Sequence, residues 1–215
     1  TECFEIVKRS FCFDIKKIEN GIIFPLSVSG MFVYMCIFFK VARKFLEYAE
    51  DIIDRNNSKE LLEYKMYDNL NIFFTGNWGE YKEYDETLTD LNLKIGEFWH
   101  ATYYTFFSGS LKVGQGIFNE AEILIRKLSD IAEFYEYKLA KISRHSLKTI
   151  FYVKSRRNLN DAQIEANAGI SLSREIGSKP WEIVFIGHKA KIQILLKNLD
   201  GAKESLNEAK ELVLR

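Results

Sequence analysis

The sequence predicts an all-α protein built from repeated antiparallel helix pairs, and three observations carry this prediction. First, the 215 residues include only two prolines and twelve glycines, whereas an average usage of about 5% would give about eleven prolines. Second, apolar residues recur with helical periodicity along the whole chain, with short turns between the periodic segments. Third, similar turn segments recur about every forty residues. Few helix breakers and a regular period together favour long helices over a turn-rich β fold.

The charge balance argues against a nucleic-acid-binding protein. Lysine and arginine together number 30, as do aspartate and glutamate, so the formal net charge is zero. Proteins that bind nucleic acid usually present a basic face and a high isoelectric point. The densest basic cluster, Lys154–Arg157, is local, and no nucleic-acid partner is expected. Hydrophobic residues make up 47% of the chain, which is ample for a packed core.

The chain ends and the cysteines indicate a module of a larger cytoplasmic protein. The sequence begins at Thr1 and stops at Arg215 within a helical pattern, so we expect a segment excised from a longer chain. Cys3, Cys12 and Cys36 are odd in number, close to the start, and without a C-x-x-C motif. We therefore expect buried thiols in a reducing cytoplasmic compartment, and neither a disulfide framework nor a zinc site.

The first elements along the chain are a partial repeat and an uncharged segment. Apolar residues at helical spacing over residues 1–20 predict the second helix of a truncated repeat. Gly21–Phe39 contains nineteen residues without a charge, which is long enough to span a bilayer. Pro25 and Gly30 interrupt its apolar character, so we expect a buried core helix. A membrane anchor formed by Gly21–Phe39 is the alternative.

A repeat of about forty residues organises the rest of the chain. Four turn segments, such as Gly76–Tyr81 and Lys197–Ala202, each run from a small or polar pair to a small or aromatic residue. The last residues of these segments are spaced 40, 41 and 40 apart: Tyr81, Ala121, Ala162 and Ala202. In the last three segments, the residues four and seven positions further on are apolar or small, which places them on one face of a helix. Each unit is therefore a helix A, a tight turn and a helix B.

The repeat predicts a single domain over residues 1–215. Ala42 lies 39 residues before Tyr81, and the residues that follow it fit the same pattern of small and apolar positions, which adds an earlier copy. A small residue in helix A, such as Gly109 or Ala190, lets the two helices of a pair approach closely. The five copies are expected at residues 21–57, 58–96, 97–138, 139–178 and 179–215.

The fourth copy gives the sharpest helix boundaries. Its helix B is expected to run over Leu159–Glu175. Gly177 then serves as a C-cap, and Pro180 falls in the first turn of the next helix.

These residues resemble the tetratricopeptide repeat (TPR) family. Gly76-Asn77-Trp78 matches the turn of that family, and Ala202, Leu206 and Ala209 match the small-apolar-small pattern of its helix B. The period departs from the family pattern, because it is about forty residues instead of 34. Lengthened repeats of this kind are similar to the TPR-like regions of STAND-type signalling ATPases and transcriptional regulators. The resemblance implies a right-handed superhelical solenoid of about eleven helices.

The sequence lacks a convergent catalytic or metal-binding motif. His100, His145 and His188 fall in successive A helices, without the spacing of a metal or catalytic site. Gly109–Gly114 resembles half of a phosphate-binding loop, but Gln115 follows where the motif requires lysine. We interpret that segment as part of a packed helix. The chain is therefore expected to be no enzyme, with no cofactor and no metal.

The resemblance also implies that the A helices line a concave groove in which a peptide or partner domain would bind. Aromatic residues crowd the A helix around Phe98–Phe107, and basic residues become frequent in the later copies. This gradient fits a peptide with hydrophobic anchors and acidic residues. The expected groove residues are Met66, Leu70, Phe73, Phe74, Tyr103, Phe106, Arg144, Leu147, Phe151, Lys154, Lys191 and Ile194.

We therefore expect a protein-interaction or scaffold module, the sensor or regulatory segment of a larger cytoplasmic signalling protein. Its partner would be a protein or a peptide, including another domain of the parent protein. The first alternative is an array that binds a small effector and relays binding through superhelix curvature. The second alternative is the membrane-tethered array. Apolar faces on the terminal repeats would also favour pairing between chains.

Overall fold

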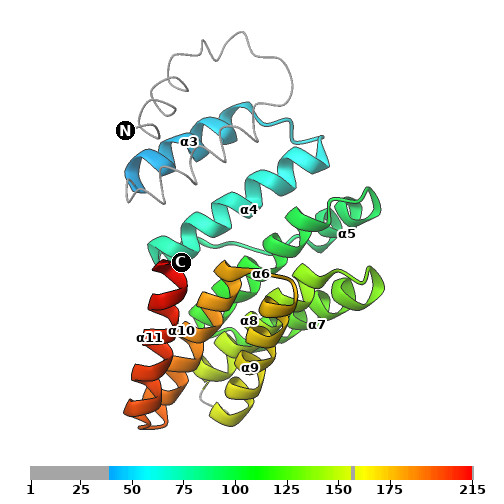
Figure 1. Ribbon diagram of the computed structural model, residues 1–215. Helices are drawn as coiled ribbons and strands as arrows, with labels where there is room; N and C mark the ends of the chain where they lie inside the picture. The colour runs from blue at the N-terminus through cyan, green and yellow to red at the C-terminus, as the bar shows by residue number, and fades with distance from the viewer. Residues whose placement is uncertain (1–38, 156–157, 215) are drawn as a thin grey trace. The chain divides into compact units, whose positions relative to one another are not determined.

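The computed structural model describes residues 39–155 and 158–214 of the chain. Nine α-helices and one short 3-10 helix make up these residues, and no strand occurs among them (Figure 1). The predicted all-α class is therefore confirmed. The superhelical solenoid and the total of eleven helices stay predictions, because the expected partial repeat over 1–20 and the segment 21–38 lie outside the described residues.

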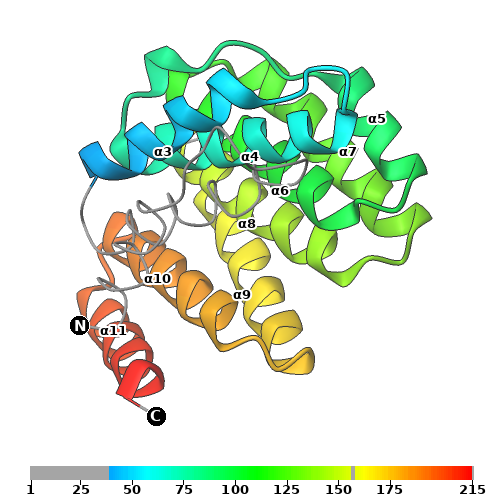
Figure 2. The same cartoon turned by 90° about the horizontal axis from the view of Figure 1, so that it is seen from above.

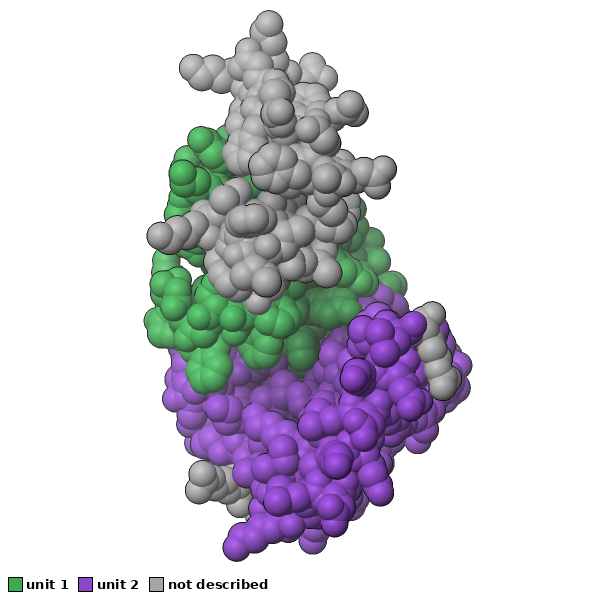
Figure 3. Space-filling view, turned by 60° about the vertical axis from the view of Figure 1, so that its left-hand side comes forward, with its two compact units in different colours: residues 1–107 green, residues 108–215 purple. Residues whose placement is uncertain are grey.

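The chain divides into two compact units, residues 1–107 and 108–215 (Figure 3). In unit 1, α4 packs against α3, η2 and α5. The side chain of Asn57 accepts hydrogen bonds from the first turn of α4, and Gly76 ends that helix. The elements of unit 1 are α3 (Phe39–Ile52), α4 (Ser58–Thr75), the 3-10 helix η2 (Trp78–Glu80), α5 (Glu86–Lys94) and the first part of α6 (Phe98–Gln115).

Unit 2 is a succession of helices in which each packs against the next. α7 contacts α8, α8 contacts α9, α9 contacts α10 and α10 contacts α11, with α8 also touching α10 (Figure 2). The elements that follow α6 are α7 (Phe118–Phe134), α8 (Lys138–Ser155), α9 (Leu159–Glu175), α10 (Lys179–Leu195) and α11 (Leu199–Leu214). The expected helix Leu159–Glu175 coincides with α9, and Pro180 lies in the first turn of α10 as predicted.

Left-handed backbone recurs at the turns with the period that the sequence predicts. Gly76, Gly116 and Lys197 end helices with φ of 79°, 79° and 62°. A second series lies between the pairs, at Gly96, Glu136 and Gly177, with φ of 88°, 50° and 69°. Glycine suits this conformation best, since it has no Cβ to clash. The second series has intervals of 40 and 41 residues, and the first has intervals of 40 and 81, the latter being two periods; both agree with the predicted period of about forty residues. The six positions therefore mark where the chain reverses.

Small residues allow close helix packing, although Gly109 lies closest to α8 and not, as predicted, to α7, the second helix of its own pair. A Cβ atom on Gly109 would lie 2.5 Å from a methyl group of Leu147. On α9, Ala162 and Ala166 are buried against the neighbouring helices. The equivalent position on α11 is Leu206, which is 53% exposed. The outer face of α11 is thus left uncovered by the described part of the chain.

The turn expected at Gly76–Tyr81 is longer than predicted. Only Trp78–Glu80 is helical, as a single 3-10 turn, and the next helix begins at Glu86. Asp85 sets that start, because its carboxylate accepts a hydrogen bond from the Leu88 N–H at 2.9 Å. The indole of Trp78 donates to the Phe73 carbonyl at 3.2 Å and holds the chain against the end of α4. Tyr81 is therefore buried in a connection and does not lie in a helix B.

The expectations for the start of the chain fall outside the described residues. These include the three cysteines and the segment Gly21–Phe39, of which only Phe39 is described, as the first residue of α3. Among the helices of residues 39–155 and 158–214, none combines the length and the apolarity that crossing a bilayer requires.

Candidate functional site

A row of aromatic side chains joins α4 and α6 in unit 1. Trp99, Tyr103 and Phe107 follow one another at four-residue intervals on α6, and Phe73 and Phe74 at the end of α4 continue the series. The ring centroids are 4.9 Å apart for Trp99–Tyr103, 6.0 Å for Tyr103–Phe107, 5.8 Å for Phe107–Phe73 and 6.4 Å for Phe107–Phe74. These separations are typical of favourable aromatic contacts. We call these five residues the aromatic row.

The aromatic row presents rings to solvent at both ends. Phe74 is 52% exposed and Trp99 is 40% exposed, while Tyr103 and Phe73 are half-buried. Phe107 is buried and forms the floor between them. Single exposed apolar side chains are ordinary, but adjoining exposed rings are typical of surfaces that bind other proteins. The row is therefore the candidate functional site of unit 1.

The structure brings together three of the predicted groove residues of unit 1. Phe73, Phe74 and Tyr103 all belong to the aromatic row. Phe106 lies behind it, buried, with its ring 5.2 Å from that of Phe107. On α4, Met66 is fully buried and Leu70 is half-buried. Met66 and Phe106 therefore belong to the core and not to an exposed binding surface, contrary to the prediction.

The predicted groove residues of unit 2 divide into core and surface. Leu147 is buried close to Gly109, and Phe151 is buried with its ring 5.7 Å from that of Phe118. Arg144 is half-buried. The remaining three side chains are exposed: Lys154, Lys191 and Ile194.

Sequence reasoning missed Trp99 and Phe107 as members of the row. It assigned positions 103 and 106 of this helix to the groove, whereas the row uses 99, 103 and 107. The four-residue spacing of three rings was the available signal, because such residues stack along one helix face. Nothing in the sequence indicated that Phe107 would be buried beneath the exposed rings of the row.

The histidines of unit 2 lie in structural contacts. His145 Nδ1 is 2.6 Å from Glu165 Oε2, and Lys148 Nζ donates to Oε1 of the same carboxylate at 3.0 Å. Burial alone would raise the pKa of Glu165, but these two hydrogen bonds outweigh it and the pKa is lowered. His188 is half-buried, and the burial of its ring, with the nearby charge of Lys191, lowers its pKa to about 4. A neutral imidazole 3.5 Å from Ser146 Oγ fits helix packing.

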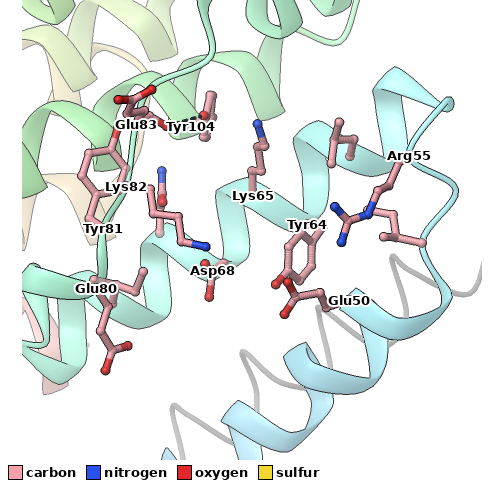
Figure 4. A pocket seen from close by; sticks show the side chains of 14 residues that line it. Glu50, Arg55, Tyr64, Lys65, Asp68, Glu80, Tyr81, Lys82, Glu83 and Tyr104 are labelled. Carbon is pink, nitrogen blue, oxygen red and sulfur yellow. Dashed lines mark hydrogen bonds between the residues drawn. The ribbon is translucent and has the colours of Figure 1, made fainter.

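A polar pocket of about 290 Å³ opens beside α4 in unit 1 (Figure 4). Tyr64, Lys65 and Asp68 extend into it from α4, between the end of α3 and the segment 80–83. Burial raises the pKa of Asp68, although Arg43 donates to its carboxylate at 2.9 Å. Charged residues of both signs line the walls: Glu50, Arg55, Lys65, Asp68, Glu80, Lys82 and Glu83. Because Ile53, Leu61 and Ile72 also line it, this pocket suits a small molecule that carries both charged and apolar groups.

Across residues 39–155 and 158–214, no group of three or more histidine, cysteine, aspartate or glutamate side chains is arranged to hold a metal ion. Comparison with known proteins adds no family: no family model matches the chain, and no curated protein matches it.

Proposed function

We propose that this chain is a non-catalytic interaction module that binds an amphipathic helix of a partner protein along the aromatic row. The observation that carries the proposal is the exposure of Trp99 and Phe74 at the two ends of a continuous series of rings. The wider role we propose is that of a sensor or scaffold segment in a larger cytoplasmic signalling protein.

The spacing of the rings supports a helical partner. Neighbouring centroids in the row are 4.9 to 6.4 Å apart. Apolar side chains one turn apart on a helix are separated by about 6 Å along its axis. A helix lying along α6 can therefore place one anchor against each successive ring. This is the usual arrangement in which an amphipathic helix binds an apolar surface.

The test is a binding measurement on defined variants. A helical 18-residue peptide is selected from a displayed library against the wild-type protein, and its Kd is measured by fluorescence anisotropy. Phe74→Ala and Trp99→Ala are each expected to weaken binding about tenfold to thirtyfold, as anchors of about 1.5–2 kcal/mol do. Phe134→Ala is the matched control, since Phe134 is 81% exposed but lies on α7 in unit 2.

Two outcomes would overturn the proposal. One is a peptide whose affinity survives Phe74→Ala and Trp99→Ala together while far-UV circular dichroism stays unchanged. The other is a loss of affinity in Phe134→Ala as large as in the row variants.

The polar pocket favours a second function, recognition of a small charged effector. Its volume and its mixed charges fit a ligand of a few polar groups, and Lys82 supplies a cationic partner for an anion, whereas Lys65 already pairs with Asp85 at 3.0 Å. Thermal-shift screening with small carboxylates and phosphates, repeated with Lys82→Ala, tests this function. A stabilising ligand whose effect persists in Lys82→Ala and in Tyr64→Ala would place its binding site elsewhere.

A further inference from the structure

A buried carboxylate faces a histidine ring between α4 and α6 of unit 1. Glu63 of α4 is only 3% exposed, and its Oε1 atom lies 4.0 Å from Nε2 of His100 on α6. Among the described residues, neither of these two atoms has a hydrogen-bond partner. Leaving buried polar atoms unsatisfied costs free energy, so the arrangement calls for a physical account.

The other nitrogen of His100 decides what Nε2 can do. Nδ1 lies 2.9 Å from Oε2 of Glu97, and the second oxygen of Glu97 is 2.5 Å from Lys59 Nζ. Burial alone would raise the pKa of Glu97, but hydrogen bonds from Lys59 and His100 outweigh it and lower the pKa. An ionised carboxylate only accepts, so Nδ1 must donate to it. The neutral ring therefore presents an acceptor at Nε2.

Two acceptors would face each other if Glu63 were also ionised. A single proton removes this conflict, whether it resides on the Glu63 carboxyl or on the His100 ring. With that proton present, a small shift that closes the 4.0 Å gap between Glu63 Oε1 and His100 Nε2 would complete a chain of hydrogen bonds from Glu63 through His100 and Glu97 to Lys59. Without it, a buried carboxylate confronts an imidazole lone pair.

The surrounding charges do not supply another donor for Glu63. On α4, Lys59, Glu60 and Tyr67 interact with it electrostatically, and Lys59 Nζ pairs with Glu97. The side-chain amide of Asn92 on α5 is not a donor to Glu63, because its N–H groups donate to the Ser58 and Leu88 carbonyls. The charged side chains of α3 that reach α4, Arg43 and Glu50, interact with Asp68 and Tyr64 instead.

The electrostatics agree with the geometry. Burial raises the pKa of Glu63 to about 7; Lys59 opposes this rise, and Glu97 and Glu60 add to it. Burial lowers the pKa of His100, against the effect of Glu97. Both groups thus favour the neutral form, which is the state in which the Glu63 hydroxyl can donate to Nε2.

We propose that Glu63 and His100 hold one proton between them at neutral pH, and that its loss as the pH rises loosens α4 from α6 and weakens binding at the aromatic row. The ring of Trp99, the exposed end of the row, contacts the ring of His100 edge-on with centroids 4.9 Å apart. A change at His100 therefore reaches the row directly. The last part of this inference rests on the proposed function, whereas the shared proton does not.

The sign of the pH dependence follows from linkage. The stabilisation by protonated Glu63 is full below the ordinary glutamate pKa of 4.5 and is lost as the pH rises through about 7. His100 acts in the opposite direction, because a lowered pKa costs stability as the pH falls from its ordinary value of 6.5. Above pH 6.5 the effect of Glu63 dominates. The pair is therefore expected to lose stability between about pH 6.5 and 8.

The test follows the Trp99 indole by NMR in the intact chain labelled with ¹⁵N-tryptophan. The Trp99 signal, assigned with Trp99→Phe, is expected to shift with a single inflection near pH 7 in the wild-type protein. Glu63→Gln is expected to remove this inflection, since an amide does not titrate. Glu60→Gln, at a half-buried neighbour on the same helix, is the matched control and is expected to keep the inflection, moved to slightly lower pH because the charge of Glu60 adds to the raised pKa of Glu63.

Two results would overturn the shared proton. The same inflection in Glu63→Gln would assign the titration to another group. If that variant does not fold, the carboxyl ¹³C signal of Glu63 in the wild-type protein decides, and a titration below pH 5 would exclude the proposal.

A separate arm tests the link to binding. The affinity of the selected peptide is expected to fall several-fold from pH 6.5 to 8.0 in the wild-type protein and not in Glu63→Gln. An equal fall in both proteins would overturn the link. A protein that binds no peptide yet shows the Trp99 inflection would refute the proposed function alone and leave the shared proton standing.

Discussion

The two units each contain a histidine whose Nδ1 contacts a glutamate, and the two sites differ at the other ring nitrogen. In unit 2, Nε2 of His145 lies 3.4 Å from an amino group of Arg144, which can only donate. In unit 1, Nε2 of His100 faces Glu63, which donates only when protonated. A guanidinium stays charged over the whole accessible pH range, whereas a carboxyl group does not. The neutral imidazole of unit 2 thus has a permanent donor beside its Nε2 atom, whereas in unit 1 the donor depends on the protonation of Glu63.

The glutamates differ in the same way. Glu165 accepts from both His145 and Lys148, so its charge is compensated on two sides. Glu63 is more deeply buried, and its Oε1 atom has no hydrogen-bond partner among the described residues. Removing the charge from each glutamate is therefore expected to have opposite effects.

The largest effect is expected from Glu165→Gln. The amide cannot satisfy Lys148 and His145 as the carboxylate does, so we expect a loss of about 2–3 kcal/mol in the free energy of unfolding at pH 7. Urea denaturation measures it, and hydrogen exchange on α8 and α9 assigns the loss to unit 2. Glu133→Gln is the control, since Glu133 is exposed and lies 3.7 Å from Arg144. Equal losses in the two variants would mean that the hydrogen bonds of Glu165 with His145 and Lys148 contribute nothing extra to stability.

A smaller effect of opposite sign is expected from Glu63→Gln at pH 8. Above its pKa of about 7, the buried carboxylate of Glu63 is ionised without a donor, and a neutral amide removes that cost. We expect a gain of about 1 kcal/mol at pH 8 and a smaller or no gain at pH 6. Urea denaturation at the two pH values tests this, and a loss of stability at pH 8 would contradict it.

The smallest effect is expected at two similar turns, one in each unit. Gly76 in unit 1 and Lys197 in unit 2 both adopt left-handed backbone after a helix, but only glycine does so without a steric cost. Lys197→Gly is expected to stabilise the protein by about 0.5–1 kcal/mol, and Gly76→Ala to destabilise it by a similar amount. Thermal unfolding compares the two variants. Destabilisation by Lys197→Gly would show that the Lys197 side chain contributes more than its backbone strain removes.

The helices of unit 2 could be predicted from the sequence because their signals are local. The apolar period, Gly177 and Pro180 together define α9 and the start of α10. The length of the turn after α4 was predicted wrongly, because Gly76-Asn77-Trp78 has the composition of a tight turn. Its extension to Asp85 depends on contacts with Phe73 and Tyr104, which are not visible in the local pattern.

The candidate site was only partly predictable, for a similar reason. An aromatic surface on α4 and α6 follows from composition and spacing, but the choice between Phe106 and Phe107 depends on how the helices pack. The contact of Glu63 with His100 joins residues far apart in the sequence, and neither residue type signals the other. A buried glutamate within an amphipathic pattern is normally interpreted as a solvated one.

The connection before α5 has a consequence for local unfolding. The backbone N–H of Asp85 donates to the phenol oxygen of Tyr104 at 3.1 Å, and the ring of Tyr84 stacks on Tyr104 with centroids 5.3 Å apart. A backbone amide held by one side chain, outside any helix, exchanges its hydrogen whenever that side chain moves away. The exchange rate at Asp85 therefore reports how often α6 and this connection separate, without requiring the helices themselves to unfold.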